Sequence, residues 1–418
     1  MTLEEFILAH RDDDIAKLLL SAKKFPGIDV SLAVNTIESR RKLRKKVPEW
    51  YTETGLSLPS PLSAEQCSST ATAAYKAALV QRIASTMGRP RLADLTGGLG
   101  VDTVAFSKIC DKVLYNDMSE TLVEAAKRNF ALLGADNVRF SCRALEKGAL
   151  EDILDGFRPD VIFLDPARRD SAARKVFRLE DCSPDITVLC DELLAAARYV
   201  LVKISPMADV SVICHTLQNI SEIHIVETAG ECKELLVLLD REHPSADSPL
   251  ITAVSLPAAT AAPHHSFSFR REEETTSAPC LMTDSDFAAL ARRPAGGAGP
   301  LLFEPGRALA KSGAFNLISS RSGLKKLDVN THLYVGEEIP EELTGLGKTF
   351  TILGTAPLSR QSMKDFGRMY PRAEVSARNI PMTSVLLRGR LGCASGGNTH
   401  IFGVSVASQK HLIAAESR

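Results

Sequence analysis

A carboxylate and a cluster of glycines in residues 91–100 form the part of the chain best suited to hold a ligand. The segment reads Arg-Leu-Ala-Asp-Leu-Thr-Gly-Gly-Leu-Gly, so Asp94 ends an apolar run and Gly97, Gly98 and Gly100 follow it closely. A strand, a glycine turn and a helix N-terminus bring a ligand close to bare backbone amides at the positive end of the helix dipole. The spacing differs from the Gly-x-Gly-x-x-Gly of nicotinamide-binding turns. It predicts a ligand site or, more simply, a glycine-rich turn of an α/β protein.

A second carboxylate, Asp117, ends the next apolar run, residues 112–116. It lies 23 residues after Asp94 (117 minus 94), close to the interval of about 20 at which an acid meets a ribose in dinucleotide folds. A carboxylate at a strand tip can accept hydrogen bonds from both ribose hydroxyls. Asp117 could instead cap the following helix, with Ser119 as the competing cap.

A third polar group follows the apolar segment 159–164, where Asp165-Pro166 is succeeded by Ala167, Arg168 and Arg169. Ligands of open α/β sheets bind at the carboxyl ends of the strands. An arginine plane there can stack on a base or pair with a phosphate. The alternative is an aspartate that caps a loop together with its own arginines.

Lys203 lies near the tip of another apolar run, residues 199–204. Lysine is seldom fully buried without a partner. If the two strands are close neighbours, Lys203 could pair with Asp165. It could also extend its ammonium group to solvent.

The elements that must position these groups alternate in the manner of a parallel α/β sheet. Helices are expected at 70–86, 101–109, 119–133 and 185–197. A capping box that begins at Ser63 precedes the first of them. Strands are expected at 91–95, 112–116, 138–142, 159–164 and 199–204, followed by a hairpin of 222–228 and 233–240.

The middle of the chain resembles the class I S-adenosylmethionine (SAM)-dependent methyltransferases. Their motif I is usually acidic-x-Gly-x-Gly-x-Gly; Thr96 stands at the place of its first glycine, a departure also found in some RNA methyltransferases. The resemblance implies an α/β fold with a seven-stranded Rossmann-like sheet and SAM as cofactor, without a metal. Many relatives bind the adenine amino group with an aspartate after the third strand, but Arg143 stands there, so backbone amides would read the ring. The cofactor-binding residues implied are Asp94, Thr96, Gly97, Gly98, Gly100, Asp117, Met118, Arg143 and Ala144.

Asp165-Pro166 resembles the Asp/Asn-Pro-Pro-aromatic motif of methyltransferases that act on exocyclic amines, although Ala167 and Arg168 replace the second proline and the aromatic residue. The resemblance implies Asp165, Pro166 and Lys203 as catalytic residues and Arg168 and Arg169 as substrate-binding residues. A lysine paired with an aspartate also resembles ribose 2′-hydroxyl methyltransferases. Residues 170–184 are expected to form a lid.

Four regions are expected: an N-terminal helical region (1–62), the methyltransferase domain (63–242), a linker (243–265) and a smaller α+β domain (266–418).

The basic run 40–46 could contact phosphate or be a solvated helix face offset by nearby acids, and Trp50 is expected to anchor its helix. The last region resembles the THUMP-like domains found C-terminal to such catalytic domains, around 302–316 and 331–336. From residue 356 onward nine Lys/Arg face three acids. Arg388 and Arg390 are expected to bind RNA phosphate, although a basic tail without such a partner is the alternative.

The composition restricts the class of protein that the chain can belong to. The chain has 418 residues, 44% of them apolar and 24% charged, with a net charge of −1, so a nucleic-acid partner must be met by local patches. Nine cysteines form no Cys-x-x-Cys pair, which indicates a reducing compartment and no zinc site. No run approaches 18 apolar residues and no signal pattern opens the chain. We expect a cytoplasmic protein without a membrane partner; the sequence is silent on its oligomeric state.

These patterns predict a SAM-dependent methyltransferase of RNA that acts on a base nitrogen in tRNA or rRNA. Two alternatives stay open: methylation of a ribose 2′-hydroxyl using Lys203, and a non-catalytic RNA-binding protein that retains SAM.

Overall fold

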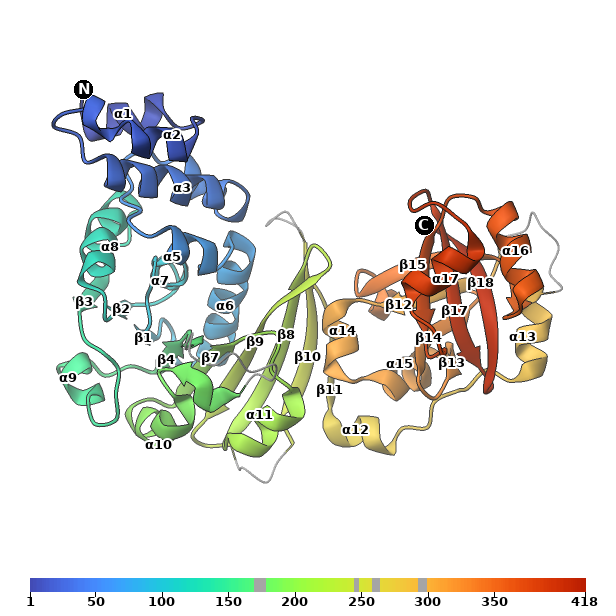
Figure 1. Cartoon of the computed structure of the whole chain (residues 1–418). Coiled ribbons are helices and arrows are strands. Elements are labelled where there is room, and N and C mark those ends of the chain that lie inside the picture. Colours follow the sequence, from blue (N-terminus) through green and yellow to red (C-terminus); the bar gives the residue numbers. More distant parts are fainter. Residues whose placement is uncertain (169–177, 244–247, 258–263, 292–298) are drawn as a thin grey trace. The chain divides into compact units, whose positions relative to one another are not determined.

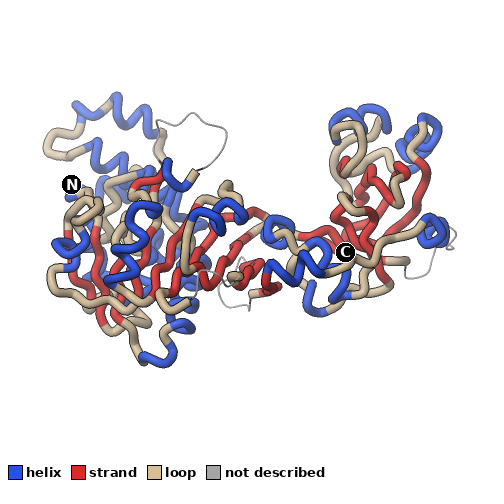
Figure 2. Tube along the Cα trace, turned by 90° about the horizontal axis from the view of Figure 1, so that it is seen from below, coloured by secondary structure: helices blue, strands red, loops and turns tan. Residues whose placement is uncertain are grey.

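A computed structural model describes residues 1–168, 178–243, 248–257, 264–291 and 299–418. The chain divides into two compact units. The first contains Met1–Ile223 and the segment that begins at Glu234; the second centres on Pro263–Arg418 and also includes His224–Lys233 and Ser248–Leu256. Figure 1 labels the elements, and Figure 2 shows helices on both sides of the strands of the first unit.

Parallel strands with apolar side chains form the centre of the first unit. Val161–Leu164 is buried throughout, which is typical of a parallel strand covered by helices on both faces. The parallel strands are β1 (Arg91–Asp94), β2 (Lys112–Asn116), β3 (Val138–Ser141), β4 (Val161–Leu164) and β7 (Tyr199–Ile204). Next come β8 (Ile220–Thr228) and β9 (Glu231–Asp240), which belong partly to each unit, and β9 pairs antiparallel with β7. Pairing is parallel between β1 and its neighbours β2 and β4, and between β4 and β7.

The helices between these strands begin at conventional caps. Ser119 accepts a hydrogen bond from the amide of Leu122, and Asp185 accepts one from Thr187. The helices are α6 (Thr70–Ile83), α7 (Val101–Ser107), α8 (Glu120–Leu132), α9 (Leu150–Leu154), α10 (Ile186–Ala196) and α11 (Val210–Thr216). Right-handed crossovers place α7 and α8 on one face of the sheet and α10 on the other.

The sheet has nine strands rather than the predicted seven, in the order β11-β10-β8-β9-β7-β4-β1-β2-β3. The two additional strands are β10 (Leu250–Leu256) and β11 (His265–Arg270), which pair antiparallel. The sequences of both segments are typical of strands, but a sequence alone does not specify which strand pairs with which. An edge strand such as β8 presents unpaired backbone groups that a further strand can satisfy.

The N-terminal helices use part of the basic run for their own packing, whereas Arg41, Arg44 and Lys45 are exposed, so phosphate contact by the run stays a prediction. Arg40 is only 8% exposed and donates to the carbonyl oxygens of Tyr51, Glu53 and Thr54. Lys42 pairs with Glu65 at 2.7 Å. Trp50 is buried, as predicted. The helices are α1 (Leu3–Ala9), α2 (Ile15–Leu20), α3 (Val30–Lys46), α4 (Pro48–Thr52) and α5 (Pro61–Gln66).

One predicted cap was also wrong. Ser60, not Ser63, accepts from a backbone amide at the start of α5, because proline at the first helical position starts the helix earlier than expected. Ser69 then caps α6, with Thr72 completing the capping box.

The second unit has a largely antiparallel seven-stranded sheet, ordered β13-β14-β12-β15-β18-β17-β16. Its described strands pair antiparallel except for β16 and β17, which are parallel. The strands are β12 (Leu301–Pro305), β13 (Lys325–Asp328), β14 (Thr331–Gly336), β15 (Gly347–Pro357), β16 (Glu374–Arg378), β17 (Thr399–Val406) and β18 (Gln409–Ser417).

Helices cover the apolar side chains of this second sheet. They are α12 (Arg271–Thr276), α13 (Asp284–Ala291), α14 (Arg307–Ser312), α15 (Phe315–Ser322), α16 (Arg360–Met369) and α17 (Ser384–Leu391). One apolar cluster lies beneath α13 and another beneath α16 and α17.

Within the described ranges, no helix combines the length and apolar character needed to span a bilayer.

Candidate active site

A cavity of about 330 Å³ opens where β1, β2, β3 and β4 end. Its size and position are those of a small-molecule site at the carboxyl edge of an open sheet. It brings together the nine residues expected at the cofactor, and Asp165 and Ala167 as well. The nine are Asp94, Thr96, Gly97, Gly98, Gly100, Asp117, Met118, Arg143 and Ala144.

The turn after β1 is built around residues that must be glycine. A Cβ on Gly97 would lie 2.1 Å from the ring of Tyr115, and one on Gly100 would lie 2.5 Å from that of Phe130. Gly98 and Gly100 also have positive φ angles of 54° and 93°. The backbone of the turn therefore lies against the aromatic rings on one side and borders the cavity on the other. Side chains at Gly97 and Gly100 would collide with the rings.

Asp94 is nearly enclosed, with 1% of its surface exposed. Its carboxylate accepts hydrogen bonds from the Thr103 hydroxyl at 2.5 Å and the Thr96 amide at 3.2 Å. Burial raises the pKa of Asp94 to about 8, because the two hydrogen bonds offset only part of the lost hydration. At neutral pH Asp94 is therefore largely protonated.

Asp117 and Asn116 tie the loops of neighbouring strands together. Asp117 accepts from the amides of Gly98 at 2.9 Å and Ser119 at 2.8 Å, so it supports the turn and the start of α8 at once. The Asn116 side chain donates to the carbonyl oxygens of Leu95 and Arg143 and accepts from the Arg143 amide. That amide is thus already paired, which leaves Ala144 as the better backbone donor to a ligand.

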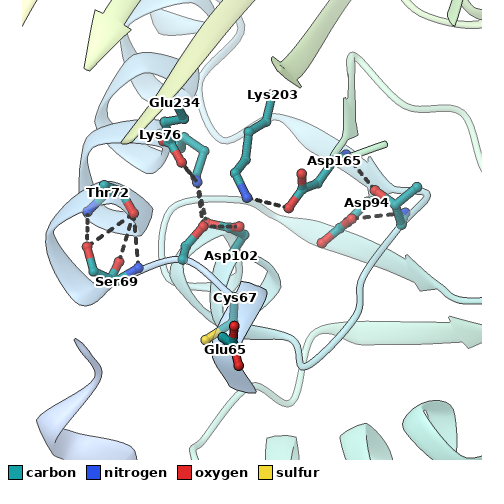
Figure 3. Close-up of polar contacts among 12 residues, drawn as sticks. Glu65, Cys67, Ser69, Thr72, Lys76, Asp94, Asp102, Asp165, Lys203 and Glu234 are labelled. Atoms are coloured by element: carbon teal, nitrogen blue, oxygen red, sulfur yellow. Dashed lines mark hydrogen bonds and ion pairs between the residues drawn. The ribbon is translucent and has the colours of Figure 1, made fainter. Parts of the chain in front are cut away.

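Thr96, at the place of a usual glycine, supports the side of the cavity that Asp165 lines. Its hydroxyl accepts from the amide of Asp165 at 2.6 Å, which links the loops after β1 and β4. Asp165 Oδ2 meets Lys203 Nζ at 2.5 Å, as the sequence suggested for adjacent strands (Figure 3). Burial opposes the charge of Lys203, but the carboxylates of Asp165, Glu234 and Asp102 outweigh it and raise the Lys203 pKa.

Sequence reasoning considered Lys76 as a possible contact of the cofactor or substrate, but it did not predict the buried cluster of charges that Lys76 forms next to the cavity. Lys76 is fully buried and lies 3.0 Å from Asp102 and 3.2 Å from Glu234. Its ammonium donates to Ser68, whose hydroxyl donates to Asp102. Asp102 and Ser68 line the cavity. A lysine within the alanine-rich segment 70–83 and a glutamate inside the apolar strand 231–240 were the available signals.

Other cavity residues come from α5 and the residue that ends it: Ser63, Gln66 and Cys67. Burial raises the pKa of the Cys67 thiol to about 11, so it is not an activated nucleophile.

The remaining predicted residues lie elsewhere. Pro166 and Lys203 do not line the cavity, and Lys203 reaches it through Asp165. The backbone of Arg168 pairs with Cys182 in a two-stranded ribbon, whereas Arg169 and most of the expected lid lie outside the described residues. Arg388 and Arg390 are on α17 in the second unit, and Arg388 pairs with Glu374 at 3.3 Å.

The donor set fits SAM. Asp117 and the glycine turn suit a ribose, the amide of Ala144 suits a base edge, and acidic groups suit the two positive charges of the cofactor. Seven strands, β3-β2-β1-β4-β7-β9-β8, supply this edge in the order expected of class I methyltransferases. No cluster of potential metal ligands occurs in the part of the chain that the structure describes.

Comparisons with known proteins agree with this architecture. A family of ferredoxin-like domains matches residues 301–343. A crystal structure described as a "putative methyltransferase from Porphyromonas gingivalis W83" is 29% identical, with 99% of this chain and 97% of that chain covered and a TM-score of 0.82. No curated protein matches the sequence.

Two further similar structures are SAM-dependent methyltransferases. The one from Agrobacterium tumefaciens is 18% identical, with 49% of this chain and 61% of that chain covered and a TM-score of 0.31. The one from Neisseria gonorrhoeae is 13% identical, with 41% and 72% covered and a TM-score of 0.29.

The strand order, the cavity and the groups that line it, together with the similarity along the whole chain, make this protein a SAM-dependent methyltransferase.

Proposed function

We propose that this methyltransferase methylates a base nitrogen in structured RNA, such as tRNA or rRNA. The observation that carries the proposal is the placement of Asp165, which lines the cavity while Thr96 and Lys203 hold its backbone and one carboxylate oxygen. Among the described residues Oδ1 has no hydrogen-bond partner, so it is available to an amine. When bound, SAM would supply a methyl group on a sulfonium: a nitrogen lone pair forms the new N–C bond, and S-adenosylhomocysteine leaves with the electrons of the broken C–S bond.

Asp165 has a specific part in this reaction. Its Oδ1 accepts a hydrogen bond from the amine N–H and so turns the lone pair toward the methyl group. The fixed ion pair with Lys203 keeps Asp165 in place without reorganisation during transfer. Until the methylated nitrogen loses a proton, the nearby carboxylate stabilises the positive charge that has developed on it.

The charge state of Lys203 argues against ribose methylation by the same site. A lysine can deprotonate a hydroxyl only from its neutral form, and three carboxylates raise the pKa of Lys203. Lys203 is therefore an ammonium that positions Asp165. Methylation of a ribose 2′-hydroxyl remains the second candidate because a lysine–aspartate pair is present, but the protonation of Lys203 disfavours it.

An RNA partner is supported by a row of exposed cations on the second unit. Arg360, Lys364 and Arg368 recur every four residues on one face of α16, and exposed Arg372 follows the helix. Arg390 on α17 is exposed too. Regularly spaced, solvated cations suit a phosphate backbone. The THUMP-like character of this unit stays a prediction, and the matched ferredoxin-like family covers only part of it.

The direct test supplies the protein with isotopically labelled SAM and total RNA, followed by mass spectrometry of the nucleosides. We expect label on a base and loss of labelling in Asp165→Ala, which should retain SAM binding by calorimetry. Label on a 2′-O-methyl ribose would favour the second candidate. SAM binding without label in any RNA would favour a non-catalytic RNA-binding protein, and unchanged labelling by Asp165→Ala would reject the role given to Asp165.

A further inference from the structure

The cavity has a second acidic wall, formed by Asp102 and supported by groups that never reach the ligand. Asp102 is 8% exposed and lines the cavity beside Ser68. Its Oδ2 accepts from the Ser68 hydroxyl at 2.7 Å, and its Oδ1 lies 3.0 Å from Lys76 Nζ. A carboxylate offers about four acceptor positions, so these two interactions leave capacity for a donor in the cavity.

Lys76 does not neutralise Asp102 by itself, because Lys76 is shared. Both oxygens of Glu234 lie 3.2 Å from the same ammonium, and Glu234 is 2% exposed (Figure 3). The other nearby lysine, Lys203, is engaged with Asp165. The three carboxyl groups of Asp102, Glu234 and Asp165 thus share two ammonium groups, so the acids outnumber their cationic partners.

Burying a carboxylate without a full counter-charge costs free energy, and a cationic ligand can reduce that cost. Burial indeed raises the pKa of Glu234, while Lys76 and Lys203 oppose the rise. A cation arriving at Asp102 would supply counter-charge that the two lysines do not provide. Ser68 and Lys76 hold the Asp102 carboxylate from two sides, so it is oriented before the ligand arrives.

The chemistry of the cofactor identifies the group concerned. The sulfonium carries no N–H or O–H donor, and the cofactor carboxylate would be repelled by Asp102. The ribose and the base have Asp117 and Ala144 on the opposite loops. The α-ammonium group of the methionine moiety is both cationic and a hydrogen-bond donor.

We infer that Asp102 is the receptor for the α-ammonium group of SAM, and that Lys76 and Glu234 are positioning residues: Lys76 orients Asp102, and Glu234 shares the Lys76 charge. The inference rests on the SAM assignment but not on the identity of the methyl acceptor. Glu234 acts by holding part of the Lys76 charge away from Asp102, so that Asp102 keeps negative potential toward the cavity.

Three ligands separate the possible roles by calorimetry. SAM and S-adenosylhomocysteine both carry the ammonium group, and only SAM carries the sulfonium; 5′-methylthioadenosine has neither. In Asp102→Asn we expect the affinities for SAM and S-adenosylhomocysteine to fall alike, about 10- to 100-fold. The affinity for 5′-methylthioadenosine should stay within about twofold of wild type, which also verifies that the site is folded.

Glu234→Gln tests the positioning role with little change of shape. It leaves Lys76 wholly to Asp102, so the same two ligands should weaken by a smaller factor, about 3- to 10-fold, while 5′-methylthioadenosine is again unaffected. Asp136→Asn, a change of an exposed acid of the same unit, is the matched control and should alter none of the three affinities.

Three results would overturn the inference. Equal weakening of all three ligands in Asp102→Asn would mean that Asp102 is structural, and weakening of SAM alone would mean that it faces the sulfonium. No change with any ligand would mean that it contacts none of them. Failure of the wild-type protein to bind any of the three would instead reject the cofactor assignment, and this inference with it.

Discussion

Lys203 and Asp165 come from neighbouring strands, and their charged groups meet at 2.5 Å beside the cavity. The Thr96 hydroxyl holds the backbone of the same aspartate from the other side. This arrangement fixes the position of the Asp165 side chain next to the cavity.

Replacing Lys203 with Met should reduce methyl transfer by about 100-fold, because Asp165 loses its counter-charge and its fixed position. Lys203→Arg should retain a larger part of the activity. Since the Lys203 pKa is raised, Lys203 should not act as a base. The pH–rate profiles of the wild-type enzyme and Lys203→Arg should therefore have the same shape at alkaline pH, without an extra rise in the wild type. Such a rise in a pH–rate profile would identify Lys203 as a general base and revive ribose methylation.

Asp94 should make the ligand-free protein less stable as pH increases. Its folded pKa of about 8 lies above the ordinary 3.8, so the folded state binds the extra proton between these values. The stability contribution is complete below about pH 4 and is lost as pH rises to about 8, by up to about 1.4 kcal/mol per pH unit.

Urea unfolding at several pH values, compared between wild type and Asp94→Asn, measures this slope. The difference in unfolding free energy between the two proteins should shift in favour of the variant as pH rises. A difference independent of pH over this range would show that Asp94 is ionised in the folded state.

Thr96→Val should impair methyl transfer more than SAM binding, since valine keeps the shape but cannot accept the hydrogen bond from the Asp165 amide. Thr96→Ser keeps that acceptor and should behave like wild type. Steady-state kinetics and calorimetry on the three proteins provide the comparison. Loss of SAM binding in Thr96→Val with normal binding in Thr96→Ser would place the hydroxyl at the cofactor instead.

Gly97→Ala should lower SAM affinity more than 10-fold and cost about 1–3 kcal/mol of unfolding free energy, because the new methyl group would overlap the Tyr115 ring. Gly134→Ala is the control: that glycine has a positive φ, but a Cβ there meets nothing within 4 Å. It should cost a similar 1–2 kcal/mol and leave SAM affinity unchanged. Equal SAM affinity in the two variants would refute the steric account of the turn.

Reversing Lys364 and Arg368 to Glu should weaken RNA binding, because the row of cations on α16 would then repel phosphate. The slope of log affinity against log salt should fall by about 1 for each phosphate that the protein no longer neutralises. SAM binding should not change. Lys348→Glu, on β15 of the same unit, is the charge-reversal control. Equal RNA affinity and salt dependence in the α16 variant and wild type would exclude the row of cations from the RNA interface.

The positions of the strands and their polar ends could be predicted from the sequence, because each strand of the parallel sheet is a short apolar run ended by a polar residue. Residues 112–116 and 199–204 coincide with β2 and β7. The convergence of Asp94, Asp117 and Asp165 follows from the rule that parallel strands share a carboxyl edge.

Tertiary pairing was harder to predict. The strand character of 250–256 and 267–269 was visible, yet the partners that extend the sheet to nine strands were not. The cations of residues 40–46 look solvated in sequence, whereas Arg40 is buried by carbonyl oxygens from a loop 11 to 14 residues away, and a carbonyl oxygen carries no sequence signal. The buried ion pairs of Lys76 were not predicted for a similar reason: its partners are 26 and 158 residues away (102 minus 76 and 234 minus 76).

The Asn116 side chain has a dynamic consequence. This side-chain amide joins the loops that follow β1 and β3 from its position at the end of β2, and the backbone carbonyl oxygen of Asn116 accepts from the Gly97 amide. Three loops joined in this way open as one cooperative segment rather than separately. Backbone amides at Gly97 and Arg143, 46 residues apart (143 minus 97), should then exchange their hydrogens with deuterium through a common opening event.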